Sequence, residues 1–370
     1  MRRREFLGLL GAAGLSAKEP PAPPVAVAKC PSYNEDLNTV LSTMFDQIGG
    51  LSGFVRGKTV TVKLNLTGSP GDRVEGRPPA VTHFSHPKMA GSLAHLLGRA
   101  GARRIRFVES CWATAGPLEE FMLDSGWNVR ALKNAAPGVE FENTNALGKS
   151  KSYGRFRVPG GAYIYPAYDL NKAYEDTDVL VSMAKLKEHA TCGVTLALKN
   201  FFGITPASIY GDDTREDEPN ESPTKGRVEV LHNGRRRPPK SAPQELDPAS
   251  SREAGYRVPR IVTDLVAARP IDLSIIDGIE TIAGGEGPWV RGVRRVHPGV
   301  LVVGTNPVTA DAVATAIMGF DPRAERGTAP FLTCDNTMRL AEAVGIGSTD
   351  LRKIEVRGVA IDAARFRFRG

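Results

Sequence analysis

The sequence predicts an α/β protein in which a mostly parallel central sheet is flanked by helices and interrupted by one long polar insertion. Short apolar runs that fit buried strands alternate with segments of helical periodicity, which is the pattern of βαβ units. The chain has 370 residues, 41% of them hydrophobic, which is enough for a large core. We therefore expect a single α/β domain over residues 29–370, preceded by a leader.

The first half of the chain contains one complete βαβ unit. Its strand at 58–64 is followed by a Gly- and Pro-rich loop, a helix with Pro87 in its first turn, and a second strand. The elements expected in this half are a helix over 35–48, a strand over 58–64, a helix over 88–100, a strand over 105–108, a helix over 117–125, short strands and turns over 128–168, and a strand over 179–183.

In the second half, residues 207–257 are rich in Asp, Glu, Arg, Pro, Ser and Asn and hold few large apolar side chains. We expect this segment to be a mobile insertion or a lid, because it offers little surface to bury. Around it the sequence predicts a helix over 191–202, a helix over 260–268, a strand over 272–276, a Gly-rich loop over 282–288, a strand over 299–304, helices over 308–318 and 333–344, and a strand over 353–356.

The N-terminus has the build of a twin-arginine export signal. Arg3 and Arg4 precede Glu5, Phe6 and Leu7, and a short Gly/Ala-rich apolar run follows. We expect residues 1–28 to be signal peptide and Pro-rich spacer, cleaved either after residue 17 or after residue 28. The protein would then be periplasmic or otherwise exported, with the twin-arginine translocase as its partner during export.

Composition excludes several classes of protein. No apolar run reaches the ~20 residues of a membrane-spanning helix, so an integral membrane protein is not expected. The formal charge of +7 is not gathered into a basic stripe with aromatic residues, so nucleic acid is not an expected partner. The four cysteines form no C-x-x-C pair, so we expect free thiols and no iron–sulfur cluster in this chain.

Lys185, Lys187 and His189 give the clearest functional signal. They directly follow a predicted strand at period-two spacing, which places side chains on one face of an extended chain. Neighbouring cations repel one another unless an anion lies among them. We expect Lys185 to bind an anionic ligand, and Lys187 and His189 to act on it. A solvated strand end with scattered lysines is the alternative.

Polar residues also follow the other predicted strands. In an open parallel sheet the ligand site lies beyond the carboxyl ends of the strands. Lys63 and Asn65 follow one strand and are expected to bind the ligand, and Asp277 follows another and is expected to orient a base or a cation. Strand ends are often hydrophilic in any protein, and this alternative explains a polar residue after any one strand. It explains less well why Lys and Asn recur after several strands.

Three further residues are expected at the same rim. Lys199 and Asn200 stand inside an apolar run, and an enclosed lysine needs either an anionic partner or a lowered pKa. Asn306 precedes Pro307 and can cap the helix that begins there, which leaves free backbone N–H groups for a ligand. We therefore expect Lys199, Asn200 and Asn306 to bind the ligand.

A divalent metal is a weaker prediction. His83 and His86 stand three residues apart in a loop, and Glu109 and Asp311 can supply oxygen ligands, but the fixed spacing of an H-E-x-x-H site is absent. Asp311 fits equally well as an acid that complements the dipole of its helix. The sequence also lacks the Walker and Rossmann glycine patterns and the G-x-S-x-G elbow of α/β hydrolases.

Five sequence blocks carry a resemblance to a known family. They are VKLNL at 62–66, SHPKMAGSLAHLLGRAGARRIRFVES at 85–110, DVLVSMAKLKEHATCGVTLALKNFFGI at 178–204, IIDGIETIAGGEGP at 275–288 and GTNPVTADAVATAIMGFDP at 304–322. Together they resemble the family called domain of unknown function 362. The resemblance implies that the matching motif positions are functional: Lys63, Asn65, His86, Lys185, Lys187, His189, Lys199, Asn200, Asp277 and Asp311.

Many members of that family carry an attached ferredoxin-like module, which implies redox work for those members. This chain lacks the cysteine runs of such a module. The sequence therefore predicts an exported α/β enzyme that acts on or binds an anionic small molecule, with lysines on its carboxylate or phosphate and His189 as proton donor or acceptor. A non-catalytic periplasmic protein that binds an anion or cofactor, and a redox protein with an external iron–sulfur partner, stay open.

Overall fold

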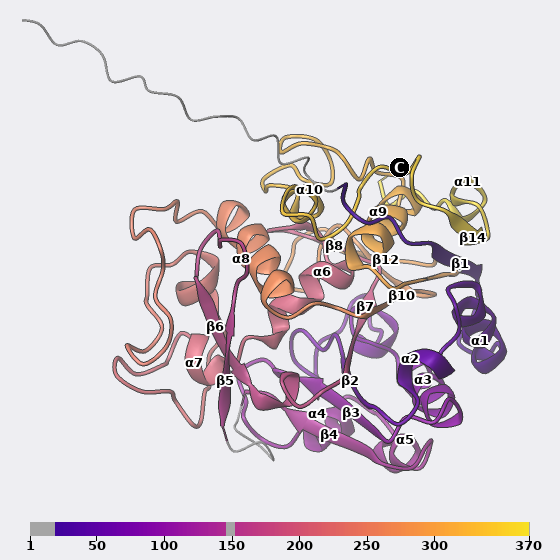
Figure 1. The fold of residues 1–370 in the computed structure, drawn as a ribbon, viewed down its shortest axis with the longest axis horizontal. Coiled ribbons are helices and arrows are strands. Elements are labelled where there is room, and N and C mark those ends of the chain that lie inside the picture. Colours follow the sequence, from indigo (N-terminus) through magenta and orange to yellow (C-terminus); the bar gives the residue numbers. More distant parts are fainter. Residues whose placement is uncertain (1–18, 146–151, 370) are drawn as a thin grey trace, which may run out of the picture.

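An eight-stranded sheet runs through the molecule in the spatial order β14-β1-β13-β10-β7-β2-β3-β4 (Figure 1). The computed structural model describes residues 19–145 and 152–369. The strands of the sheet are β1 (Val25–Lys29), β2 (Thr59–Lys63), β3 (Arg104–Glu109), β4 (Val139–Asn143), β7 (Val179–Lys185), β10 (Leu273–Gly278), β13 (Val300–Gly304) and β14 (Val356–Gly358). The predicted α/β class with a mostly parallel sheet is confirmed.

One strand reverses the direction of this sheet. Strands β10, β7, β2, β3 and β4 pair in parallel, whereas β13 pairs antiparallel with both β10 and β1. The carboxyl ends of β2, β3, β7 and β10 therefore share one edge of the sheet. The carboxyl end of β13 lies at the opposite edge, because Gly304 is in register with Ser274 at the start of β10.

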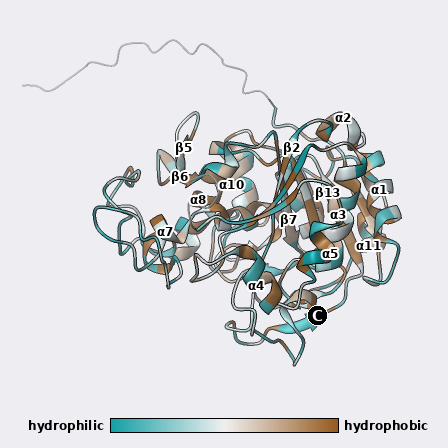
Figure 2. Ribbon diagram, turned by 90° about the horizontal axis from the view of Figure 1, so that it is seen from below, coloured by the Kyte–Doolittle hydropathy of each residue, from teal (hydrophilic) through white to brown (hydrophobic). Residues whose placement is uncertain are grey.

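Helices cover both faces of the sheet (Figure 1). Residues that alternate along a strand enter two separate apolar cores, as Val25 and Val27 on one face and Ala26 on the other illustrate. The first face is covered by α6 (Leu196–Asn200), α8 (Ala254–Ala268), α9 (Pro307–Ile317) and α10 (Thr337–Ala343), and the second by α1 (Leu37–Gln47), α3 (Pro87–Arg99), α4 (Leu118–Asp124) and α5 (Val129–Lys133). Strands β2 and β7 are buried along their whole length, as expected for parallel strands that are covered on both faces, and β7 and β13 are among the brown elements of Figure 2.

Shorter elements complete the described chain. Three two-stranded pieces are β5 (Tyr153–Arg157) with β6 (Ala167–Asn171), β8 (Glu188–His189) with β9 (Gly193–Val194), and β11 (Thr281–Ala283) with β12 (Arg294–Val296). The short helices are α2 (Ser52–Val55), α7 (Ala207–Tyr210) and α11 (Ile361–Ala364). No helix of the described residues is long and apolar enough to cross a membrane, and the four cysteines are buried and free.

The boundary expected after residue 28 is corrected by β1. Residues 25–29 pair with β13 on one side and with β14 on the other, so this stretch is a strand of the central sheet and not a spacer. Val25 and Ala26 are completely buried. Cleavage after residue 28 would therefore remove most of a central strand. The expected signal at residues 1–18 lies outside the described residues.

The helix expected over 191–202 is broken into three pieces. Gly193 takes a φ of +72°, with the Phe331 ring against it, and closes the β8–β9 hairpin. Only then does α6 begin, and the chain continues as a 3₁₀ turn over Phe201–Ile204. The positive φ, which favours glycine, explains why the apolar periodicity here does not produce one continuous helix.

The helix expected over 260–268 begins earlier, at Ala254, and contains Pro259. Proline has no N–H to donate to the carbonyl of Gly255, four residues before it. That carbonyl instead accepts a hydrogen bond from the amide of Asp335, at 2.9 Å. The helix tolerates the proline because another segment satisfies the acceptor that the proline leaves free. The expected last helix and strand also shift, to α10 and β14.

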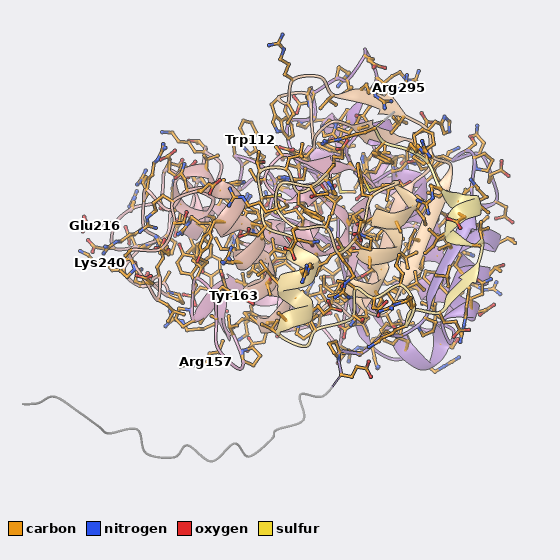
Figure 3. The ribbon with its side chains drawn as sticks, turned by 90° about the horizontal axis from the view of Figure 1, so that it is seen from above. Trp112, Arg157, Tyr163, Glu216, Lys240 and Arg295 are labelled. Carbon is orange, nitrogen blue, oxygen red and sulfur yellow. The ribbon has the colours of Figure 1, made fainter. Side chains whose placement is uncertain are left out.

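The insertion, residues 207–257, packs against the main body. Ile209, Tyr210 and Leu231 lie in the apolar core beside α8, contrary to the expectation that the segment buries little. It contains α7 and one π-helical turn over Val228–His232. Figure 3 labels Glu216 and Lys240 at its outer end, where the two side chains pair at 2.8 Å. A lid motion of this segment stays a prediction.

Candidate functional site

Three neighbouring parallel strands end at one cavity of about 530 Å³. Strands β2, β3 and β7 lead into it, and α6, the insertion and the loop after β11 close its other sides. We call it the strand-end cavity. Its lining residues are Lys63, Asn65, Leu66, Thr67, Gly68, Ser69, Asp72, Glu109, Ser110, Trp112, Lys187, His189, Thr191, Thr195, Lys199, Asn200, Phe202, Gly203, Gly226, Arg227, Val228, His232, Glu286 and Trp289.

Lys63 and Glu109 form an ion pair on the wall of the cavity. Lys63 Nζ lies 2.6 Å from Glu109 Oε1 and also donates to the carbonyl of Leu64. Glu109 further accepts from the backbone amides of Leu66 and Ser110, at 2.7 and 3.0 Å. Both side chains are buried, so their opposite charges compensate each other. Lys63 is therefore largely neutralised within the protein.

Lys199 lines the cavity without a carboxylate partner among the described residues. Its ammonium group makes no hydrogen bond or ion pair with the residues that the structure describes, and it lies 4.4 Å from the centre of the Phe202 ring. Burial lowers its pKa. One helical turn earlier, the hydroxyl of Thr195 is buried without a hydrogen-bond partner, and so is the Oδ1 atom of Asn65. Unsatisfied buried polar groups are rare in folded proteins and call for an explanation.

Arg227 brings a second cation from the insertion. Its Nε donates to the carbonyl of Thr205 at 2.7 Å, and its Nη2 to the carbonyl of Ser110 and to Asn145 Oδ1, each at 3.2 Å. All three acceptors are neutral, so hydrogen bonds orient the guanidinium without cancelling its charge. Together Lys199 and Arg227 give the cavity positive charge that no carboxylate of residues 19–145 and 152–369 pairs directly.

Lys187 combines deep burial with neutral partners. Its ammonium donates to the backbone carbonyls of His83 and Glu286, at 2.8 and 3.1 Å. Burial lowers the pKa of Lys187 to about 7, with a smaller contribution from Lys199 and Lys185. A lysine with a pKa near neutrality exists in both protonation states at neutral pH, which is the property required of a group that transfers protons.

Two histidines of the cavity are held in opposite tautomers. His189 Nδ1 accepts from the amide of Thr191 at 3.1 Å, which places its proton on Nε2. His232 Nδ1 lies 3.1 Å from the carbonyl of Arg227, an acceptor, so this nitrogen carries the proton and Nε2 is bare. Burial lowers the pKa of His189 well below its usual range and that of His232 to about 4. At neutral pH the cavity therefore presents one N–H donor and one nitrogen acceptor.

Glu286 fixes the geometry around His189. Its carboxylate accepts from the amide of Ala190 at 2.9 Å and from the indole of Trp289 at 3.0 Å, and it lies 3.8 Å from His189 Nδ1. Burial alone would raise the pKa of Glu286, but the hydrogen bonds from Ala190 and Trp289 act in the opposite direction, and the pKa is lowered to about 2. Glu286 therefore remains ionised.

Lys185 and Asp277 do not reach the strand-end cavity. Lys185 Nζ lies 2.9 Å from Asp277 Oδ2, and neither side chain is exposed. The hydroxyl of Tyr33 donates to Asp277 and accepts from Lys185. The sequence placed Lys185, Lys187 and His189 on one face, but β7 ends at Lys185 and the chain then turns into the β8–β9 hairpin. Lys185 and Asp277 thus pair with each other outside the strand-end cavity, and their expected roles in ligand binding and catalysis stay a prediction.

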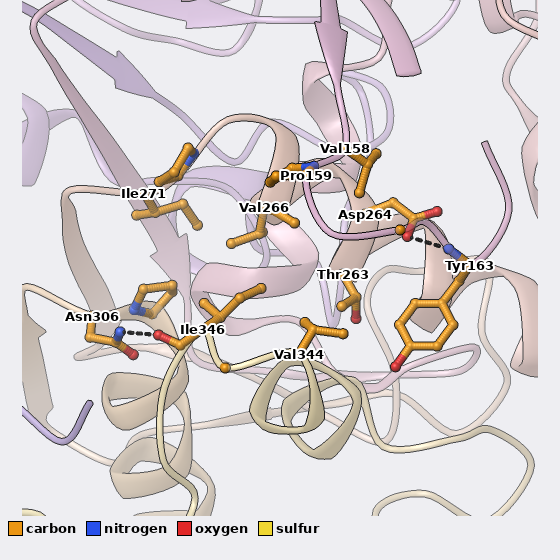
Figure 4. A pocket seen from close by; sticks show the side chains of 15 residues that line it. Val158, Pro159, Tyr163, Thr263, Asp264, Val266, Ile271, Asn306, Val344 and Ile346 are labelled. Carbon is orange, nitrogen blue, oxygen red and sulfur yellow. Dashed lines mark hydrogen bonds between the residues drawn. The ribbon is translucent and has the colours of Figure 1, made fainter. Parts of the chain in front are cut away.

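Asn306 lies at the other edge of the sheet, because β13 is antiparallel to its neighbours. Its Oδ1 caps α9 by accepting from the amides of Val308 and Thr309, as the sequence predicts. Figure 4 shows it beside an apolar pocket of about 270 Å³ with Val266 and Ile346. Asn306 is thus a helix cap away from the strand-end cavity, and the prediction that it binds the same ligand is corrected.

The four expected metal ligands do not come together. His86 caps α3 and stacks on Tyr33, His83 bonds Thr82, and Glu109 pairs with Lys63. Asp311 accepts from the amides of Ala197 and Leu198, at 2.8 and 2.9 Å, and so fixes the start of α6. Among the residues that the structure describes, no group of three His, Cys, Asp or Glu side chains is arranged to hold a metal ion.

Several lining residues carry no strong sequence signal. Arg227 and His232 belong to the insertion, whose composition suggested a mobile segment, and Thr195 looks like part of an apolar helix. Glu286 lies within a glycine-rich loop that matches no nucleotide motif, and Trp289 directly follows it. The sequence feature that comes nearest to predicting Glu286 and Trp289 is the glycine-rich loop itself, since glycines let the backbone approach a ligand or a ring.

The fold and the cavity define an α/β protein with a cation-lined site at the ends of parallel strands. Residues 60–316 match the family model described as "Domain of unknown function (DUF362)", and the chain belongs to this family. A thylakoid-associated protein of Synechocystis sp. is 24% identical over 327 residues, which cover 88% of this chain and 80% of that protein.

Two solved structures are similar in part. The lactate racemase apoprotein from Thermoanaerobacterium thermosaccharolyticum has a TM-score of 0.35 and 12% identity, over 74% of this chain and 54% of that chain. A structural-genomics protein from Thermotoga maritima has a TM-score of 0.35 and 15% identity, over 73% of this chain and 56% of that one. The chain thus spans little more than half the length of either.

Proposed function

We propose that the protein is an enzyme that binds an anionic small molecule in the strand-end cavity and transfers a proton to or from it. Lys199 and Arg227 bind the carboxylate or phosphate, His189 donates a hydrogen bond from Nε2 to an oxygen of the ligand, and Lys187 transfers the proton. The remaining polar walls position the ligand, with Asn65 and Asn200 beside the Lys63–Glu109 pair.

The single observation that supports this proposal most strongly is the unpaired ammonium of Lys199. Lys199 is half-buried, and a bound anion supplies the opposite charge that its ammonium lacks among the described residues. The orphaned hydroxyl of Thr195 lies on the same side of α6, one turn away, and offers a hydrogen bond to the same group. If the protein satisfied its own polar groups here, neither the Lys199 ammonium nor the Thr195 hydroxyl would lack a hydrogen bond.

Proton transfer is supported by Lys187, whose lowered pKa suits neutral pH and whose side chain lines the same cavity. The test is exchange of carbon-bound hydrogen for deuterium in a panel of small carboxylates and phosphates, followed by NMR in D₂O. Lys187→Met should abolish exchange and retain anion binding, with Lys172→Met as the matched loss of a surface lysine. Equal exchange by Lys187→Met and wild type would refute the assigned role.

We further propose that the protein is exported by the twin-arginine route. The support is the sequence of residues 1–18, together with β1, which leaves the site after residue 17 as the cleavage site compatible with an intact sheet. Replacement of Arg3 and Arg4 by lysine should retain the protein in the cytoplasm. Unimpaired export of that variant would contradict the proposal.

A further inference from the structure

Large apolar side chains border the opening of the strand-end cavity. Among the described residues seven large hydrophobic side chains are exposed, and three of them line this one cavity: Trp112, Val228 and Trp289. Trp112 is 52% exposed and Trp289 is 50% exposed. Figure 3 marks Trp112 at the surface. Exposed apolar area gathered at the edge of a cavity is typical of a ligand-binding site.

The Trp289 ring is held in place by several contacts. Its indole N–H donates to Glu286 Oε1 at 3.0 Å, and the ring lies edge-on to His83 with 5.9 Å between ring centres. A Cβ atom at Gly287 would come within 2.3 Å of the ring, and one at Gly68 within 2.6 Å. Glycines at both positions therefore make room for the indole. The glycine-rich loop serves to accommodate the Trp289 ring, which explains its glycines without a bound phosphate.

Trp112 is accommodated in the same way from another loop. It follows β3, and a Cβ atom at Gly226 of the insertion would lie 3.0 Å from its indole nitrogen. Gly226 precedes Arg227, so the segment that supplies the guanidinium also makes room for a tryptophan. Two indoles from separate loops thus flank a site whose interior holds the cations.

The carboxylate of Asp72 indicates how a ligand lies in the site. A Cβ atom at Gly68 would meet Asp72 Oδ2 as well as the Trp289 ring, so the carboxylate and the indole are neighbours. Asp72 accepts from the amide of Ser69 and forms no ion pair among the described residues. A negative charge on the ligand is therefore disfavoured beside Trp289 and favoured near Lys199 and Arg227.

We infer that the ligand is an amphiphilic anion: a carboxylate or phosphate joined to a flat, apolar body of aromatic or polycyclic character. The anionic end lies at Lys199 and Arg227, and the flat body lies against Trp289 and Trp112. Stacking on two indoles stabilises such a body, and a small hydrophilic anion gains nothing from them. This inference rests on the proposed anion site and adds the class of its ligand.

The test uses three carboxylates of equal charge, acetate, benzoate and 2-naphthoate, with dissociation constants measured by calorimetry on the full chain. Wild type should bind 2-naphthoate about tenfold or more tightly than acetate. In the double variant Trp112→Leu/Trp289→Leu this preference should shrink to about threefold or less, with acetate affinity unchanged. Trp289→Phe, which keeps a ring, should retain most of the preference, and Leu123→Ala, an exposed apolar residue outside the cavity, is the control.

The outcomes separate this inference from the proposed function. If wild type binds acetate and 2-naphthoate equally well, or if the double variant keeps the preference, the flat-ligand inference is wrong and anion binding stands. If none of the three carboxylates binds, both are wrong. Loss of all binding in Lys199→Met with loss of only the preference in the tryptophan variant supports both.

Discussion

Lys185 Nζ lies 2.9 Å from Asp277 Oδ2, and both side chains are completely buried. The pair joins the ends of β7 and β10 and includes Tyr33, whose ring stacks on His86 with 3.5 Å between ring centres. Two residues that the sequence assigns to ligand binding and catalysis are thus engaged with each other. Their charges hold adjacent strands and the segment before α1 together.

The first prediction concerns the stability that this pair provides. Lys185→Met leaves a buried carboxylate without its cation, which should lower the free energy of unfolding by about 3–5 kcal/mol. Lys172→Met removes one side of an exposed pair with Glu175 and should cost less than about 1 kcal/mol. Chemical denaturation measures both. If Lys185→Met keeps full stability but loses anion binding, Lys185 is a ligand-binding residue after all.

The second prediction concerns pH and Lys187. Its pKa is about 7 in the folded protein and 10.5 without the fold, so between these values the unfolded chain binds more protons. Unfolding free energy therefore rises with pH in this window, by up to about 1.4 kcal/mol per pH unit from this group. Lys187→Met should lose that slope between pH 7.5 and 9.5, as denaturation at several pH values will show. An unchanged slope would mean that the Lys187 pKa is not depressed.

The third prediction concerns histidine tautomers. His189 should carry its proton on Nε2 and His232 on Nδ1, because Nδ1 faces the amide of Thr191 in the first and the carbonyl of Arg227 in the second. Burial lowers both pKa values, so neither ring should titrate between pH 5 and 8. Nitrogen-15 NMR of the imidazoles distinguishes the tautomers. Identical tautomers, or titration near pH 6.5, would contradict the described hydrogen bonds.

The fourth prediction concerns Asp311 as a positioning residue. Both of its oxygens accept backbone amides at the start of α6, the helix that carries Lys199. Asp311→Ala leaves two buried N–H groups unsatisfied and should lower stability by about 1–3 kcal/mol per lost group. It should also weaken anion binding, although the carboxylate lies outside the cavity. A stable variant with unchanged sulfate affinity would show that α6 does not depend on Asp311.

The fifth prediction concerns the N-terminal boundary. A chain that starts at Glu19 keeps β1 and should fold, whereas one that starts at Ser32 lacks the strand between β13 and β14 and should not form soluble, cooperatively unfolding protein. Circular dichroism and thermal unfolding of the two chains compare them. Equal stability would show that β1 is dispensable.

The parallel strands are predictable because each is a short apolar run followed by polar residues, as Lys63 and Lys187 show. The direction of β13 is not predictable from that pattern, since alternation and burial are the same in either direction. Assuming a parallel β13 puts Asn306 at the edge with Lys63, whereas the antiparallel strand puts it at the opposite edge. Lys185 and Lys187 do not share one site, because β7 ends at Lys185 and the chain turns before Lys187. Arg227 and Trp289 were missed because tertiary contacts alone bring the insertion and the loop after β11 to the cavity.

The most direct test of the account is sulfate binding by Lys199→Met, measured by calorimetry at low ionic strength. Sulfate keeps its charge across neutral pH, and methionine preserves the apolar stem of lysine. Wild type should bind sulfate and be stabilised by it against heat, while Lys199→Met should lose at least about tenfold in affinity and Lys172→Met should behave as wild type. Equal sulfate affinity in wild type and Lys199→Met would contradict the proposal that the strand-end cavity binds an anion through its unpaired lysine.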